Sequence, residues 1–274
     1  GEIGNPVGND YFDDTYYRNG KPEAFEGYCT DIFFRETMRF IKEGVDEKSK
    51  QPFFVYLPLN AMHGPFTVAD KYSAPFTEKG IPESRSIFYG MIQNFDENLG
   101  KLLTSLKQWN IDDDTLVIFM GDNGTAAGSN GKLDSDGFNA AMKGKKGAVY
   151  EGGHRVACFA RWPQKLKAGG SIDKLTMHTD WLPTLTELCD LKKNKNLNWD
   201  GRSIASLLEG KSNDWKARSI FISKQADQLN LWKPGGNNQS KYPHFAVLSE
   251  KWRYVDGELY DIRADPSQTT DVAK

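Results

Sequence analysis

One apolar run of the sequence leads directly into two side chains that could bind a hard cation. Residues 115–120 read Thr-Leu-Val-Ile-Phe-Met, and Gly121 is then followed by Asp122 and Asn123. A carboxylate and an amide carbonyl are oxygen donors that suit Ca²⁺ or Mg²⁺. Together with Gly124, the same residues are also ordinary turn chemistry. The tripeptide alone therefore leaves a turn and a metal site as competing interpretations.

Two further segments carry side chains that could bind an anion. Residues 143–156 place Lys146 among glycines, which let a backbone approach a ligand closely. Residues 53–59 form an apolar run, and His63 follows in a loop. A histidine there can donate to an anionic substrate or serve acid–base chemistry. Taken singly, each segment also has a plain interpretation as a solvated or structural loop.

The predicted strands bring these side chains together. Ligands of parallel α/β sheets bind at the carboxyl ends of the strands, so we expect Asp122, Asn123, Lys146 and His63 to share one crevice. A hard cation, a lysine and a histidine around one cavity describe a site for a tetrahedral oxyanion ester. The cation polarises a nonbridging oxygen, and the two basic side chains neutralise charge on the leaving side.

Amphipathic helices alternate with apolar strands along most of the chain. The expected helices cover about residues 30–43, 82–109 and 180–188, and the expected strands cover 52–59, 115–120 and 156–162. This order predicts an α/β fold with a mostly parallel sheet covered by helices on both faces. Short strands at 219–223, 244–248, 252–255 and 259–262 predict a small antiparallel sheet. We expect a catalytic α/β domain over residues 1–213 and an antiparallel subdomain over 214–274.

The composition is that of an ordinary globular protein. The 274 residues are 38% hydrophobic and carry a formal net charge of −2, which argues against a nucleic-acid binder. No apolar run approaches the ~18 residues needed to span a bilayer. Of the three cysteines, Cys29, Cys158 and Cys189, at least one is unpaired within a monomer. We expect Cys158 and Cys189 to be buried thiols, because both lie in apolar runs.

Several segments, in order along nearly the whole chain, resemble the sulfatase family of the alkaline-phosphatase-like superfamily. They are Gly27–Asp31, His63–Pro65, Asn94–Gly100, Gly121–Gly124, Lys146–Arg155, Asp180–Thr184, Asp200–Ser203 and Glu258–Pro266. The segment Lys146–Arg155 is the most specific of them. The resemblance implies an alkaline-phosphatase-like fold and the hydrolysis of sulfate esters.

The resemblance also implies roles for individual residues. Asp122 and Asn123 would be metal ligands, with Ca²⁺ the usual metal and Mg²⁺ a substitute. Lys146 would contact the sulfate and help to protonate or neutralise the leaving oxygen, and His63 would hydrogen-bond the sulfate. His154 is a further candidate for substrate contact.

Other charged residues near Lys146 are expected to act outside the reaction. We expect Glu151 and Arg155 to fix their loop by an ion pair. Lys143 and Lys145 are expected to stay in solvent. His178 precedes a predicted helix and is expected to be structural.

The element that carries the family's nucleophile has no counterpart in the chain. That nucleophile is a formylglycine made from cysteine or serine in a C/S-x-P/A-x-R element, and no cysteine or serine here fits it. Cys158 comes closest, but Arg161 follows it one place early. The family's paired metal-binding aspartates lie upstream, and Asp13 and Asp14 do not follow an apolar strand. We therefore expect a carboxyl-terminal part of a sulfatase that is inactive alone.

Other functions, the partners and the location stay open at this level. A phosphatase or phosphodiesterase of the superfamily would use a serine or threonine nucleophile, and a non-catalytic module would bind sulfated glycans without cleaving them. A sulfated carbohydrate is an expected substrate, with residues 124–142 and 225–242, including Trp232, as specificity loops. A missing amino-terminal segment or self-association should cover unpaired strand edges. The family is often exported, which implies a periplasmic or secreted protein.

Overall fold

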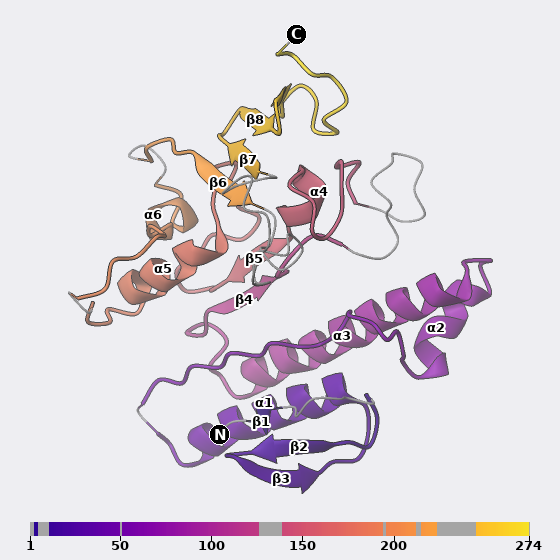
Figure 1. The fold of residues 1–274 in the computed structure, drawn as a ribbon. Helices are drawn as coiled ribbons and strands as arrows, with labels where there is room; N and C mark the ends of the chain where they lie inside the picture. Colours follow the sequence, from indigo (N-terminus) through magenta and orange to yellow (C-terminus); the bar gives the residue numbers. More distant parts are fainter. Residues whose placement is uncertain are drawn as a thin grey trace, which may run out of the picture. The chain divides into compact units, whose positions relative to one another are not determined.

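The chain divides into two units in the computed structural model, residues 1–115 (unit 1) and residues 116–274 (unit 2). The structure describes residues 3–4, 11–49, 51–125, 139–193, 196–211, 215–223 and 245–273. Figure 1 traces the order of the elements, and each unit is considered by itself. The expected domain boundary between residues 213 and 214 lies outside the described residues and stays a prediction.

Unit 1 combines a small antiparallel sheet with three helices. The strands β1 (Ile3–Gly4), β2 (Thr15–Arg18) and β3 (Lys21–Ala24) lie in that order, and the helices are α1 (Cys29–Asp46), α2 (Asp70–Thr77) and α3 (Glu83–Gln108). The longest helix, α3, packs against both α1 and α2 (Figure 1). The helices predicted from periodicity near residues 30–43 and 82–109 are therefore confirmed.

Helices α1 and α3 contact each other through buried apolar side chains and through hydrogen-bonded polar side chains beside them. Ile32 of α1 and Met91 of α3 are both fully buried in one core cluster. Next to them, Asn94 and Asn98 of α3 donate to the carboxylate of Asp31 at 2.8 and 2.6 Å. Burial supplies most of the stabilisation, and the hydrogen bonds fix how the two helices face each other.

The apolar segment at residues 52–59 is not a strand, so that prediction is wrong. Phe54 and Tyr56 are 75% and 78% exposed. No described strand pairs with this segment. A strand needs ladder hydrogen bonds from a neighbour, and apolar side chains need a surface to cover them. The sequence pattern of residues 52–59 specifies neither a neighbouring strand nor a covering surface.

Unit 2 begins with a strand pair and continues through short helices. Strands β4 (Val117–Met120) and β5 (Cys158–Arg161) pair antiparallel, and they flank α4 (Glu151–His154) in sequence. Next come a 3₁₀ turn η1 (His178–Asp180), α5 (Trp181–Leu188) and α6 (Ala205–Leu208). Cys158 and Cys189 are exposed, contrary to expectation, because β5 has one strand neighbour and Cys189 lies just beyond α5. Cys29, in unit 1, is the buried thiol.

The carboxyl-terminal sheet is antiparallel, as predicted. Its strands β6 (Ile220–Ser223), β7 (Phe245–Leu248), β8 (Trp252–Val255) and β9 (Glu258–Asp261) are hydrogen-bonded in chain order. The expected mixture of helix and strand is therefore confirmed. The expected parallel pairing is not seen in the described residues, where every strand pair is antiparallel. The strand predicted at 52–59 remains unpaired there, and β4 pairs only with β5.

A buried carboxylate anchors the start of α5. The side chain of Asp180 has no exposed surface, and Arg218 pairs with both of its oxygens, one of them at 2.8 Å. The backbone N–H groups of Arg202 and Met177 also donate to it, at 3.0 and 2.8 Å. Burial raises the pKa of Asp180, but these four donors outweigh it and hold the pKa below its usual value.

This depressed pKa predicts how stability depends on pH. The stabilisation from ionised Asp180 is complete above its unfolded pKa of ~3.9 and is lost as pH falls through the lower folded value. Asp180→Asn removes that titration. The difference in free energy of unfolding between wild type and variant should therefore shrink as the pH falls below ~4. Denaturant titrations at several acidic pH values measure it, and a difference that stays constant with pH would contradict the assignment.

Candidate active site

The predicted metal ligands follow β4 directly. Asp122 is exposed and Asn123 is half-buried, one and two residues beyond Gly121. The amide nitrogen of Asn123 donates to the carbonyl of Gly124 at 3.2 Å. This contact uses the nitrogen, so the amide oxygen is the atom that can serve a cation. The pair thus presents hard oxygen donors at a strand end, as the sequence predicts.

The loop that carries Lys146 is locked to the loop that carries the predicted ligands. Gly124 donates its N–H to the carbonyl of Gly153 at 3.0 Å, and Lys146 donates its own to the carbonyl of Thr125 at 2.9 Å. A Cβ atom on Gly124 would lie 1.9 Å from the carbonyl oxygen of Gly152. Only glycine permits this approach. Two of the three predicted loops are therefore neighbours, and their glycines serve contact between the loops.

Lys146 itself projects from a tight turn. Its side chain is exposed, and glycines with positive φ angles lie on both sides, at +86° for Gly144 and +85° for Gly147. The turn closes where Ala148 donates its N–H to the carbonyl of Lys145 at 2.8 Å. The ammonium group is thus presented outward from a constrained backbone, which suits a contact with an anion.

Lys143 departs from expectation. It is not simply solvated, because its side chain is 34% exposed and contacts Tyr260 and Glu258 of β9. Lys145 is exposed, as expected. The difference arises from tertiary packing, since Tyr260 lies 117 positions further along the chain than Lys143.

The expected ion pair of Glu151 is present, but its closer partner is a different arginine. Nη1 of Arg155 lies 3.5 Å from the Glu151 carboxylate and is on a 61% exposed side chain. Arg253 of β8 makes a shorter contact, with side chains 8% and 1% exposed for Arg253 and Glu151. The side-chain oxygen of Gln268 also accepts the backbone N–H of Glu151 at 2.9 Å. Sequence reasoning missed Arg253 and Gln268, for which no local pattern exists.

His154 faces inward. Its Nε2 atom is buried and has no hydrogen-bond partner within the described residues. Burial lowers the pKa of His154, with Arg253 acting in the same direction and Glu151 against it. The neutral imidazole supplies no positive charge to an anion, and substrate contact by His154 stays a prediction.

His63 lies in unit 1, in a loop held by three hydrogen bonds. Its N–H donates to the carbonyl of Asn60, and its own carbonyl accepts from the hydroxyl of Tyr11, both at 2.8 Å. Nδ1 of the exposed ring lies 2.8 Å from the carbonyl of Gly64. A carbonyl only accepts, so Nδ1 carries a proton, and Nε2 can donate to a sulfate only when the ring is cationic. Its approach to the residues of unit 2 stays a prediction.

His178 supports the predicted metal loop. Its Nε2 lies 2.8 Å from the carbonyl of Gly121, the residue before Asp122. The expectation of a structural role is thereby given a specific contact. Since the carbonyl accepts, Nε2 donates, and η1 is tied to the end of β4.

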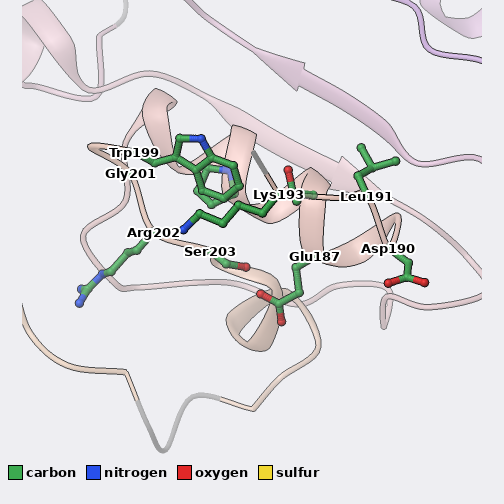
Figure 2. Close-up of a pocket in the computed structure, with 10 residues that line it drawn as sticks. Glu187, Asp190, Leu191, Lys193, Trp199, Gly201, Arg202 and Ser203 are labelled. Carbon is green, nitrogen blue, oxygen red and sulfur yellow. The ribbon is translucent and has the colours of Figure 1, made fainter. Parts of the chain in front are cut away.

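A shallow hollow of about 520 Å³ in unit 2 is separate from these residues. Figure 2 shows its lining residues, with Lys193 under the Trp199 ring and the Arg202 side chain pointing away from them. The ammonium of Lys193 lies 4.5 Å from the centre of the Trp199 ring. None of the predicted site residues lines it.

The number and type of the available ligand atoms decide whether a divalent cation fits this site. Within the described residues, no group of three or more His, Cys, Asp and Glu side chains is placed to hold a metal. Asp122 and the amide oxygen of Asn123 are two oxygen donors, and Ca²⁺ takes about six to eight oxygen ligands. The residues present therefore fit part of a calcium shell.

Comparison with known proteins gives the family to which this fold belongs. The family described as Sulfatase matches residues 3–191, and the one described as N-sulphoglucosamine sulphohydrolase, C-terminal, matches residues 144–274. The chain belongs to the sulfatase family. The family uses a metal and a formylglycine.

Curated relatives agree with this assignment. The chain is 31% identical over 250 residues to steryl-sulfatase of Homo sapiens, covering 82% of this chain and 41% of that protein. It is 30% identical over 206 residues to the uncharacterized sulfatase YdeN of Escherichia coli, covering 73% of this chain and 34% of that protein. The chain thus spans half or less of the length of these relatives.

Solved structures share the fold. The crystal structure of Ps i-CgsB in complex with k-i-k-neocarrahexaose matches with a TM-score of 0.80 and 29% identity, covering 95% of this chain and 54% of that one. BT4656 in complex with D-Glucosamine-2-N, 6-O-disulfate matches with a TM-score of 0.65 and 15% identity, covering 96% and 69%. The second likeness concerns the fold alone.

Proposed function

We propose that the protein hydrolyses sulfate esters and that this chain supplies part of the active site. The main support is the pair of backbone hydrogen bonds that join the Asp122–Asn123 loop to the Lys146 loop, at 3.0 and 2.9 Å. They hold two oxygen donors and a lysine on neighbouring loops. Membership of the sulfatase family favours a sulfate ester over the phosphate ester of the alternative enzyme.

In this proposal each residue acts on one part of the sulfate group. Asp122 and Asn123 would hold a Ca²⁺ ion, which would supply Lewis-acid chemistry at a nonbridging oxygen of the sulfate. Lys146 neutralises or protonates the leaving oxygen, where negative charge develops. His63, as the imidazolium, donates through Nε2 to the sulfate. The family's formylglycine would supply the nucleophile, since no cysteine or serine of this chain fits the element that carries it.

The proposal extends to substrate, location and partners. One solved relative, 29% identical to this chain, is a complex with the oligosaccharide k-i-k-neocarrahexaose, so a sulfated carbohydrate is the proposed substrate class. Trp232, the proposed stacking residue, lies outside the described residues. The helices of the described ranges include none that is long and apolar enough to cross a membrane. A periplasmic or secreted protein is proposed, in which an amino-terminal segment or a second copy covers Phe54 and Tyr56.

Loss of calcium affinity tests the metal assignment. In the full-length protein, Asp122→Ala should weaken Ca²⁺ binding at least ~10–100-fold, the range that removal of even an outer-shell partner causes. Titration calorimetry measures the affinity, and turnover of an aryl sulfate should fall in parallel. Asp113→Ala is the matched control, since it deletes an exposed carboxylate of the same charge in unit 1. Unchanged calcium affinity in Asp122→Ala would remove the proposed ligand.

A further inference from the structure

One lysine of the 143–146 cluster lies against two aromatic rings, one close by in sequence and one from β9. Nζ of Lys143 lies 4.1 Å from the centre of the Tyr150 ring and 5.1 Å from that of Tyr260. It donates to the hydroxyl of Tyr260 at 3.0 Å, and the Glu258 carboxylate lies 3.7 Å away. We call Tyr150, Tyr260 and Glu258 the Lys143 cage. Two ring faces and a carboxylate are a complementary environment for an ammonium group.

The cage is held together by its own hydrogen bonds. The hydroxyls of Tyr150 and Tyr260 both donate to the carboxylate of Glu258, the first at 3.0 Å. The hydroxyl of Tyr260 lowers the pKa of Glu258, while burial and Glu258 raise the pKa of Tyr150 to about 12. The cage therefore keeps one negative charge and neutral phenols around neutral pH. This charge matches the single cation it encloses.

The Lys143 cage contacts both ends of the turn that presents Lys146. Lys143 and Tyr150 bracket that turn in sequence, and the carbonyl of Lys143 accepts the N–H of Gly152 at 2.8 Å. Between them, Val149 is buried in the cluster formed with Val255 and other residues of the carboxyl-terminal sheet. The turn is thus fixed to that sheet by a charged anchor and by an apolar one.

We propose that Lys143 is a positioning residue for Lys146, which it holds in place through the cage on β9. The proposal rests on the role of Lys146 in the proposed function. The charge of Lys143 is matched by Glu258, which leaves the proposed substrate contact to Lys146 and not to Lys143. Misplacing a catalytic group by about 1 Å can cost ~10²-fold in rate, which sets the scale of the effect.

The dependence of kcat on the leaving group distinguishes a positioning role of Lys143 from a purely structural one. An alkyl sulfate has a poor leaving group that needs neutralisation, whereas an aryl sulfate with an acidic phenol needs little. In the full-length enzyme, Lys143→Met should lower kcat ~10–100-fold for the alkyl sulfate and much less for the aryl sulfate. Lys143→Arg keeps the cation over the rings and should restore most of the activity. Tyr260→Phe, which removes one hydroxyl, should change both rates in the same sense as Lys143→Met.

Substitutions of Lys145 and Lys146 serve as comparisons for the Lys143 variants. Lys145→Met removes the same charge two positions away and should change both rates within about twofold, as surface substitutions do. Equal losses of Lys143→Met on both substrates, or no recovery with Lys143→Arg, would overturn the positioning role. If Lys146→Met leaves turnover of the alkyl sulfate intact, the proposed function fails instead. A selective loss in Lys146→Met without one in Lys143→Met rejects only the present inference.

Discussion

Lys146→Met in the full-length protein is expected to lower kcat for an alkyl sulfate by ~10²–10³-fold, the range for a group that stabilises developing charge. Lys146 is exposed at the tip of a glycine-flanked turn, and its backbone N–H is bonded to the carbonyl of Thr125 at 2.9 Å. The backbone of Lys146 is therefore held next to the loop that carries Asp122 and Asn123. Steady-state kinetics with alkyl and aryl sulfates measure the effect.

The adjacent lysine serves as the control for this substitution. Lys145→Met removes one positive charge from the next position, but Lys145 has no assigned role in the site. If both variants lost activity to the same extent, general charge rather than a specific contact would explain the effect of Lys146. A loss confined to Lys146→Met, and larger for the alkyl sulfate, is the expected pattern.

Arg253→Met is expected to cost ~3–5 kcal/mol of the free energy of unfolding, the usual cost of removing one partner of a buried ion pair. The Glu151 side chain is 1% exposed and its pairing with Arg253 is the contact that offsets its desolvation. Methionine keeps much of the volume of arginine but leaves the carboxylate with a distant partner. Chemical denaturation of the full-length protein measures the change.

Arg155→Met supplies a matched comparison at the same carboxylate. Arg155 lies 3.5 Å from Glu151 and its side chain is 61% exposed, so solvent screens the interaction. Its loss should cost ~0–1 kcal/mol, as for surface ion pairs. The two variants make the same substitution against the same partner, and they differ in burial and in the hydrogen bonds that Arg253 donates to the carbonyls of Ser249 and Trp252. Similar costs would show that burial does not decide the strength of these pairs.

Local pattern predicted several elements and failed at others for identifiable reasons. The apolar spacing of residues 82–109 predicted α3, because a helix is stabilised along one of its own faces. The equally apolar run at residues 52–59 did not become a strand, because a strand depends on a neighbour. Cys158 lies in a true strand, β5, yet is exposed. Its apolar neighbours predicted the strand but not which face would be covered.

The candidate site likewise contains residues that local sequence predicted and contacts that it did not predict. Asp122, Asn123 and Lys146 were predicted from residue type, strand ends and family resemblance, all of which can be recognised over short stretches of sequence. The structure places their two loops in contact, whereas the role of each residue remains a proposal. The expectation for Lys143 was wrong because its cage contains residues more than a hundred positions away in the sequence. Glu151 and Arg253 are also more than a hundred positions apart. Local sequence could reveal neither contact.

The sequence by itself determined the family, the helices α1, α3 and α5, the strands before and after the Lys146 loop, and the residue types that a sulfate ester would require. Those features depend on periodicity and on short motifs, which act over a few residues. Only the tertiary structure decided which charges are paired, which glycines touch, and which apolar segments stay uncovered. Such outcomes depend on contacts between segments distant in sequence, where burial and distance set the strength of each interaction.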